Sequence, residues 1–307
     1  MVKLMIDHRV ENIYWMARYM ERALFSLNIG KSYLGYGLEA SQEKWNYCWQ
    51  RIKKGMRIFS TPEPTNSSLP VSLFFLLFDS ENPLSAMSSL FSARENSKIL
   101  RDILPVALWE QLNEAYFLLS STTVTSSLQP SHYPLITSTI EKMLLFGQLE
   151  YYLFEEDELW AWLRAGEYIE KIGNFAALLF AYDPTENKDN PSFEEWEAFL
   201  NSLFLLDLFR KKVGLASLSF DKITSFILLA NKYPYSILSQ LEKLMGCLGI
   251  ISQEWIVDMA QSTTKELLGK IVDSYRKEVS SENRKKLFLE IQIACNSIHQ
   301  HLLSAIG

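Results

Sequence analysis

Apolar residues recur three and four positions apart along almost the whole chain, which is the spacing of an amphipathic α-helix. No run alternates strictly between apolar and polar residues as a half-buried strand would, and no Asn-Gly or Asp-Gly pair marks a hairpin. The pattern predicts helices over 7–31, 42–58, 68–78, 83–103, 134–154, 157–182, 221–231, 234–247, 252–277 and 280–305, with two more beginning at Pro105 and after Ser192. We therefore expect an all-α, multi-helix bundle of about a dozen helices.

Two of these helices carry clear start signals. Asn82-Pro83 has the form of an N-cap residue followed by proline at the first helical position. Ser192, with Glu195 three residues later, has the form of a capping box. These signals predict helices that begin at residues 83 and 193.

The chain length allows one large domain or two modest ones, because 307 residues can bury a substantial core. We expect a single helical domain over 1–307, or two packed halves, 1–120 and 132–307, joined by the Ser/Thr-rich stretch 120–131. A weak internal sequence similarity is consistent with two halves, since Tyr19 and Glu21 can be aligned with Tyr168 and Glu170. Short similarities between amphipathic helices also arise by chance, so this one only suggests a repeat.

Composition narrows the class of protein. The chain is 48% hydrophobic and 21% charged, which is typical of a globular protein, and its net charge of −6 argues against a nucleic-acid partner. The three cysteines, Cys48, Cys247 and Cys295, lie far apart and are expected to be reduced, buried thiols. The chain opens on an amphipathic helix rather than a signal peptide, and its longest apolar run, 71–78, is too short to span a bilayer. We expect a cytoplasmic protein without a membrane segment.

The first helix carries unusual polar residues. At about 100° per residue, one sector roughly 120° wide combines charged and aromatic side chains. They are Glu11, Tyr14, Trp15, Arg18, Glu21 and Arg22. This face has two interpretations: a buried charge network that fixes helix register, or a polar cleft. In a cleft the arginines would bind a carboxylate or phosphate, and a glutamate would act as a base.

Two further polar groups stand out. The first is Arg94, Glu95, Asn96, Arg101 and Asp102, and the second is Glu167, Glu170 and Lys171. No metal site is expected, because His299 and His301 diverge on a helix and no Glu-x-x-His or Cys-x-x-Cys motif occurs. No Gly-rich phosphate loop and no Gly-x-Ser-x-Gly motif occurs either, so the chain itself is expected to bind no nucleotide. The eight tryptophans lie at helical spacing and are expected in the core or at interfaces.

Residues 8–23 resemble the N-terminal signature of the alpha-E family, bacterial all-helical proteins, which reads approximately Arg-x-Glu-Asn-x-Tyr-Trp-x-x-Arg-Tyr-x-Glu-Arg-Ala. The matching residues are Arg9, Glu11, Asn12, Tyr14, Trp15, Arg18, Tyr19, Glu21, Arg22 and Ala23. Further blocks follow in the family's order at 82–85, 93–96, 101–102, 109–113, 163–171 and 233–236. The chain departs from the family pattern at Glu167, Lys171 and Tyr235, each of which stands where the family usually has arginine.

The resemblance implies a role in peptide or amide ligation or modification. Alpha-E proteins typically occur with, or fused to, a circularly permuted ATP-grasp protein, and ATP-grasp enzymes join a carboxylate to an amine through an acyl-phosphate. ATP and Mg²⁺ are accordingly expected on that partner, and a peptide or an amino acid is expected as substrate. On this hypothesis the catalytic candidates are Glu11, Glu21 and Glu95. The substrate-binding candidates are Arg9, Asn12, Tyr14, Trp15, Arg18, Arg22, Arg94, Asn96, Arg101 and Glu170.

The alternative is a non-catalytic helical scaffold or adaptor that holds the ATP-grasp partner or a peptide substrate. Its polar groups would then be buried salt bridges and interface contacts. A free-standing hydrolase is the least supported interpretation, because the sequence shows neither a nucleophile pair nor a metal motif.

Overall fold

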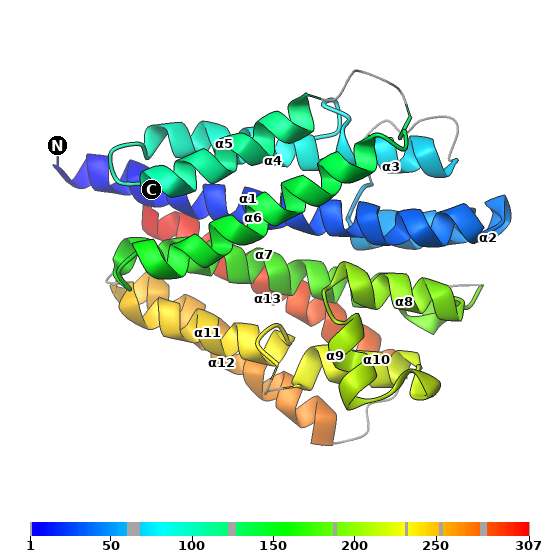
Figure 1. The fold of residues 1–307 in the computed structure, drawn as a ribbon. Helices are drawn as coiled ribbons and strands as arrows, with labels where there is room; N and C mark the ends of the chain where they lie inside the picture. The colour runs from blue at the N-terminus through cyan, green and yellow to red at the C-terminus, as the bar shows by residue number, and fades with distance from the viewer. Residues whose placement is uncertain are drawn as a thin grey trace. The chain divides into compact units, whose positions relative to one another are not determined.

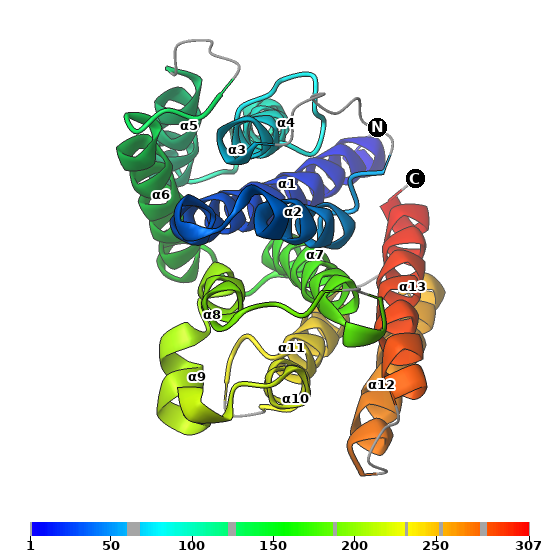
Figure 2. The same cartoon turned by 90° about the vertical axis from the view of Figure 1, so that its right-hand side faces the viewer.

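The computed structural model describes residues 2–59, 68–121, 127–186, 189–230, 233–251, 254–276 and 281–306. Across these ranges the chain forms thirteen α-helices and two short 3₁₀ segments, and none of the described residues forms a strand (Figure 1, Figure 2). The all-α prediction is therefore confirmed. The internal repeat stays a prediction.

The helices are bounded as follows. They are α1 Val2–Glu39, α2 Gln42–Gly55, α3 Leu69–Leu77, α4 Ala86–Ile99, α5 Val106–Ser120, α6 His132–Leu153, α7 Glu158–Tyr182, α8 Phe193–Ser202, α9 Leu206–Lys212, α10 Phe220–Leu229, α11 Ile237–Ile250, α12 Glu254–Arg276 and α13 Ser281–Ile306. The 3₁₀ segments are η1 Pro184–Glu186 and η2 Leu215–Ser217. The sequence pattern missed α9, which is only seven residues long.

The chain divides into two compact units. The first comprises Met1–Ala17, Glu155–Asn190 and Phe209–Gly307, and the second comprises Arg18–Phe154 and Pro191–Leu208. The halves 1–120 and 132–307 stay a prediction, and residues 122–126 of their proposed linker lie outside the described residues. Residues 60–67, between the predicted helices 42–58 and 68–78, also lie outside the described residues.

Helix α1 runs further than the predicted range 7–31, despite three glycines in its second half, of which Gly30 and Gly37 face α3. A side chain at Gly30 would collide with Leu77, and one at Gly37 would collide with Leu69, both of helix α3. These glycines therefore allow α3 to approach closely rather than ending α1. The gain from burying apolar surface outweighs the low helix propensity of glycine here.

The predicted helix start at Asn82-Pro83 is wrong. Helix α4 begins three residues later, where the Ser85 hydroxyl accepts a hydrogen bond from the Ser88 amide at 3.1 Å. The Asn82 side chain is fully buried, donates to the Phe75 carbonyl at 3.0 Å and accepts from the Leu84 amide at 3.0 Å. Asparagine followed by proline forms turns as well as caps, and here the tertiary contact with α3 selects the turn.

Two other helix starts agree with the sequence. Asp157 caps α7 by accepting from the Trp160 amide at 2.9 Å. Ser192 caps α8 by accepting from the Glu195 amide at 3.2 Å. The Glu195 carboxylate binds Arg51.

In the second unit α3 packs on α4, α4 on α5 and α5 on α6. In the first unit α7 packs against both α11 and α13, and α12 packs against α11 and α13 (Figure 2). Every residue of α7 from Ala161 to Tyr182 is buried except Glu167 and Phe180. Buried charged side chains require partners, so this helix is where polar contacts within the first unit are concentrated.

The thiol prediction is confirmed, and the prediction of core tryptophans is confirmed for Trp45, Trp49, Trp162 and Trp196, which are buried. Trp15, Trp109 and Trp160 are half-buried, and the Trp255 side chain lies outside the described residues. All three cysteines are buried free thiols. None of the described helices is both long enough and apolar enough to cross a bilayer.

Candidate functional site

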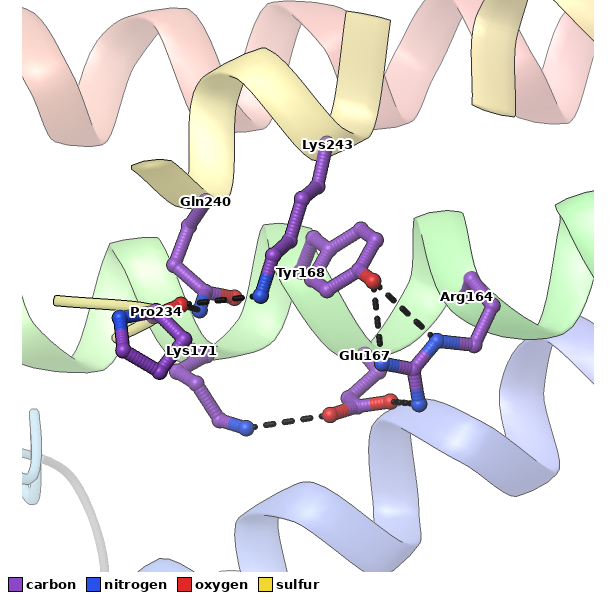
Figure 3. Close-up of polar contacts among 7 residues, drawn as sticks. All are labelled: Arg164, Glu167, Tyr168, Lys171, Pro234, Gln240 and Lys243. Carbon is purple, nitrogen blue, oxygen red and sulfur yellow. Dashed lines mark hydrogen bonds and ion pairs between the residues drawn. The ribbon is translucent and has the colours of Figure 1, made fainter. Parts of the chain in front are cut away.

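A polar cluster forms in the first unit where α11 and the segment before it meet α7 (Figure 3). We call it the α7–α11 cluster. Its members are Arg164, Glu167, Tyr168 and Lys171 of α7, Tyr235 of the preceding segment, and Lys243 of α11. The α7 members share one face because they are spaced three and four residues apart.

Glu167 joins two cations through its two carboxylate oxygens. Oε2 forms an ion pair with Nη1 of Arg164, and Oε1 accepts from Nζ of Lys171 at 3.0 Å. Burial alone would raise the pKa of this carboxyl, but Arg164 and Lys171 together hold it below the ordinary value. Glu167 is therefore an ionised anchor for its neighbours.

Arg164 is also fixed by the phenol of Tyr168. Its Nε and Nη2 atoms donate to the Tyr168 hydroxyl at 3.2 and 2.9 Å, and its guanidinium carbon lies 4.8 Å from the centre of that ring. Contacts with a carboxylate and an aromatic ring at once suit the planar guanidinium. Arg164 is thus held rigidly inside the unit.

Lys243 differs from the other cations of the cluster. Its Nζ donates to the Pro234 carbonyl at 3.0 Å, and Gln240 donates to the same oxygen. Among the described residues no carboxylate forms an ion pair with it. Burial and the nearby charges of Arg164 and Lys171 lower the pKa of the Lys243 amine, while Glu167 opposes the shift. A cation in this position favours an incoming anion.

Tyr235 places an aromatic ring beside both lysines. The ring centre lies 5.1 Å from Nζ of Lys171 and 6.0 Å from Nζ of Lys243. The tyrosine is 42% exposed, so this end of the cluster opens to solvent. Lys171 is buried and Lys243 is half-buried, so Lys243 is the lysine of this pair that a small ligand would approach from this end. An aromatic face beside cations also suits an unsaturated anion.

The candidates Tyr14 and Trp15 meet an unexpected residue, His299 of α13. The Tyr14 hydroxyl and His299 Nδ1 are hydrogen-bonded at 2.8 Å, and the two rings stack with centres 5.7 Å apart. Trp15 meets the same imidazole edge to face at 5.2 Å, and Trp162 meets the Tyr14 ring at 6.1 Å. Tyr14 is fully buried, so this group stabilises the first unit.

Two candidate asparagines bond within their own helices. Asn12 donates its side-chain amide to the His8 carbonyl at 2.6 Å, and Asn96 donates to the Ser92 carbonyl at 2.7 Å. Each bond reaches back four residues along the helix. The remaining oxygen of each amide stays the group that could meet a ligand.

The other α1 candidates are Arg9, Glu11, Arg18, Glu21 and Arg22. Glu21 is only 7% exposed, whereas the four others are half-buried. The Arg22 guanidinium carbon lies 5.4 Å from the ring centre of Tyr19. Arg9 and Glu11 belong to the first unit and the other three to the second, so a single cleft shared by all five stays a prediction.

In the second unit Arg94 lies among aromatic rings. Its Nε donates to Asn113 Oδ1 at 2.7 Å. Its guanidinium carbon is 5.1 Å from the ring centre of Tyr116, 5.2 Å from that of Phe117 and 5.9 Å from that of Trp109. Arg94 therefore joins α4 to α5 in addition to any role with a ligand.

Glu95 and Arg101 lie nearer the surface. Glu95 is 42% exposed, forms an ion pair with Lys98 and lies 3.6 Å from Arg94. The exposed Arg101 lies 4.7 Å over the Trp109 ring. Arg94 and Glu95 are neighbours in the sequence, and their role as site residues stays a prediction.

Sequence reasoning found only part of the α7–α11 cluster. The spacing of Glu167 and Lys171 places them on one face of a helix, and Arg164 could have been added by the same rule. Nothing in the sequence indicated Lys243 or His299, because their partners come from distant segments. The candidate Glu170, from the same helix, is 2% exposed.

The three positions where the chain departs from the alpha-E pattern meet in this cluster. Lys171 binds Glu167 and lies against the ring of Tyr235, although positions 167 and 235 are far apart in the sequence. Arginines at all three positions would give a strongly cationic site. In this chain the same place holds one carboxylate, one lysine and one phenol.

No group of three metal-ligating side chains gathers anywhere in the part of the chain that the structure describes. The cluster also contains more cations than carboxylates among its six members, which is the opposite of a cation site. Its donor set suits a carboxylate or a phosphate instead.

Comparison with known proteins identifies the family. Curated proteins give no significant match. Solved structures give none either. A family model described as a predicted alpha-helical domain with a conserved ER motif matches residues 5–305, and the adjacent Glu21 and Arg22 of α1 lie within that match. Because this match covers nearly the whole chain, the protein belongs to the Alpha-E family.

Proposed function

We propose that this chain is the substrate-holding subunit of an ATP-grasp-associated system for peptide or amide ligation or modification. ATP and Mg²⁺ bind to a circularly permuted ATP-grasp partner in this proposal, and this chain holds an anionic group of the peptide or amino-acid substrate. The observation that carries the proposal is the environment of Lys243. This half-buried lysine lies in a cationic cluster, and no carboxylate among the described residues forms an ion pair with it.

The chemistry of the cluster matches a ligation substrate. Such a reaction activates a carboxylate, and the substrate's carboxylate or acyl-phosphate would accept hydrogen bonds from the Lys243 amine. Lys171 and Arg164 add positive potential, while Glu167 keeps both of them in place. An anion bound beside Lys243 would raise the lowered pKa of its amine. Binding of the anion therefore favours the protonated amine, and the protonated amine favours binding of the anion.

Glu11, Glu21 and Glu95 stay the candidates for orienting or deprotonating the attacking amine, each within its own unit. The exposure of Glu95 supports access to a substrate, and the burial of Glu21 supports a carboxylate with restricted geometry. The remaining candidates on α1 and α4 stay candidates for substrate binding within their own units.

The alternative function, a non-catalytic scaffold for the partner or for a peptide, is favoured by a different observation. Arg94 already binds Asn113 and three aromatic rings, and the amide groups of Asn12 and Asn96 donate to their own helices. Contacts of this kind stabilise helices without any chemistry. The substrate-holding subunit and the scaffold would both bind the ATP-grasp partner. They differ in whether substitution of the polar residues changes the turnover of the complex.

The test is co-expression with a circularly permuted ATP-grasp protein encoded beside this chain, followed by copurification and assay of ATP consumption. Amino acids and short peptides serve as substrates. We expect a stable complex whose turnover requires this chain, and we expect Lys243→Met to raise the KM for the carboxylate substrate. Lys211→Met is the matched control, because Lys211 is an exposed lysine of the same unit.

Two further variants separate the roles of the acidic residues. Glu21→Ala and Glu95→Ala should each abolish product formation while the complex still assembles. Retained activity in both would remove the catalytic role and favour the scaffold. Absence of any complex would overturn the proposed function as a whole.

A further inference from the structure

The surroundings of the Lys243 amine affect its reactivity as a nucleophile as well as its charge. Its hydrogen-bond acceptor is the neutral Pro234 carbonyl, at 3.0 Å, and its Nζ lies 6.0 Å from the ring centre of Tyr235. Both Glu167 oxygens, the nearest carboxylate oxygens in the cluster, are engaged by Arg164 and Lys171. The charge of Lys243 is therefore poorly compensated inside the described unit.

Two positive neighbours act on this amine together with burial. The charges of Arg164 and Lys171 favour the unprotonated form, the attraction of Glu167 works against them, and the net result is a lowered pKa. A lysine that is desolvated or placed next to another cation is the usual form of an amine nucleophile, since the neutral amine carries the reactive lone pair.

The other nucleophile near the cluster does not compete. Burial raises the pKa of the Cys247 thiol to about 12, so the thiolate is scarce at neutral pH. The two tyrosines of the cluster, Tyr168 and Tyr235, are much weaker nucleophiles toward a carbonyl group, and the Lys171 amine is engaged by the Glu167 carboxylate. Lys243 is thus the side chain of this site with suitable chemistry.

We propose that the Lys243 ε-amine forms an imine with a carbonyl compound that carries a carboxylate or phosphate group. The anionic group would lie near the charges of Lys171 and Arg164, which brings the carbonyl carbon to Nζ. This activity goes beyond the proposed ligation role and requires neither ATP nor a partner protein.

The chemical step is balanced without a redox reagent. The Nζ lone pair attacks the carbonyl carbon, and the electrons of the C=O π bond move to the oxygen, which takes up a proton. The resulting carbinolamine loses the nitrogen proton and its hydroxyl group, which leaves as water after protonation. One C=N bond forms, one C=O bond breaks and one molecule of water is released.

The test uses the full-length chain alone with 4-carboxybenzaldehyde and, in parallel, with its neutral methyl ester. Sodium cyanoborohydride reduces any imine to a stable secondary amine, and peptide mass spectrometry gives the labelling rate of each lysine. Lys211 and Lys222, which are exposed in the same unit, serve as internal references. We expect the acid to label Lys243 at least about threefold faster than either reference at pH 7.

The ester should lose this preference, because it carries no negative charge. Equal labelling of Lys243 by acid and ester would overturn the proposal, as would a Lys243 rate no faster than that of the exposed lysines. Both results come from the unmodified protein, so they do not depend on a variant that folds.

A variant of the chain tests the electrostatic cause of the Lys243 reactivity. Lys171→Met removes one neighbouring cation and should slow labelling of Lys243 and shift its pH profile to higher pH, while Lys211 keeps its rate. An unchanged Lys243 profile in a folded variant, verified by circular dichroism, would contradict the proposed activation. Because ATP and partner are absent, failure here is distinct from failure of the ligation assay.

Discussion

Arg51 and Glu195 form a two-bond ion pair in the interior of the second unit. Nη2 of Arg51 lies 2.6 Å from Oε2 of Glu195, and Nε lies 2.9 Å from Oε1, while the two side chains are only 2% and 1% exposed. Tyr36 donates to the same carboxylate at 3.4 Å, and burial and the charge of Glu195 raise the pKa of its phenol. This pair connects α2 to α8, and its two residues are 144 positions apart in the sequence.

Arg51→Met should destabilise the protein by about 3–5 kcal/mol, because it leaves the Glu195 carboxylate buried without its cation. Urea unfolding followed by circular dichroism measures the change. The double variant Arg51→Met/Glu195→Leu should recover most of the loss, since it removes both charges. A single variant as stable as the natural protein would show that the ion pair contributes little.

Asn82→Ala should cost about 2–3 kcal/mol, because the fully buried side chain both donates to Phe75 and accepts from Leu84. Ser85→Ala should cost about 1 kcal/mol, since it removes the cap of α4. Thermal and urea unfolding of both variants provide the measurement. A neutral Ser85→Ala would support a helix that begins at Asn82.

Glu167→Gln should change how stability depends on pH. The folded-state pKa of Glu167 is below its ordinary value of 4.5, because Arg164 and Lys171 outweigh burial. Its contribution is therefore fully present above pH 4.5 and is lost as pH falls through the lowered folded-state value. Unfolding free energies measured from pH 7 to pH 3 should show the natural protein losing its advantage over the variant in the acid range.

The control for this experiment is Glu266→Gln, at a carboxylate that is 67% exposed and paired with Lys270. An exposed ion pair contributes little, so this variant should follow the natural protein at each pH. A constant difference between Glu167→Gln and the natural protein over the whole range would contradict the assigned electrostatic cause.

Tyr14→Phe should cost about 1 kcal/mol, because it removes the hydrogen bond between the hydroxyl and His299 while keeping the stacked ring. His299→Ala should cost more, since the ring contacts with both Tyr14 and Trp15 are lost. Unfolding curves for the two variants measure these changes, and Tyr47→Phe, at a 41% exposed tyrosine, serves as control. An effect of Tyr14→Phe no greater than that of Tyr47→Phe would mean that the hydrogen bond is not a stabilising contact.

The periodicity of apolar residues was sufficient to predict the class of fold and most of its helices. The range 157–182 agrees with α7 to within one residue, because Asp157 both interrupts the pattern and supplies the cap. The prediction of a helix start was wrong at Asn82, because an asparagine before a proline can either cap a helix or form a turn. The seven-residue α9 was missed because it is too short to show a period.

The sequence by itself determined the helical character of the chain, its family and the polar faces on α1, α4 and α7. These depend on spacing within one segment, which a linear pattern records. Only the tertiary structure decided that Lys243 stands near Arg164 and Lys171 without a carboxylate ion-pair partner among the described residues, and that Tyr14 meets His299 across 285 residues. Such contacts between distant residues arise when whole helices pack together. Packing depends on how many side chains fit against one another at once, and the order of residues within one short segment does not record that fit.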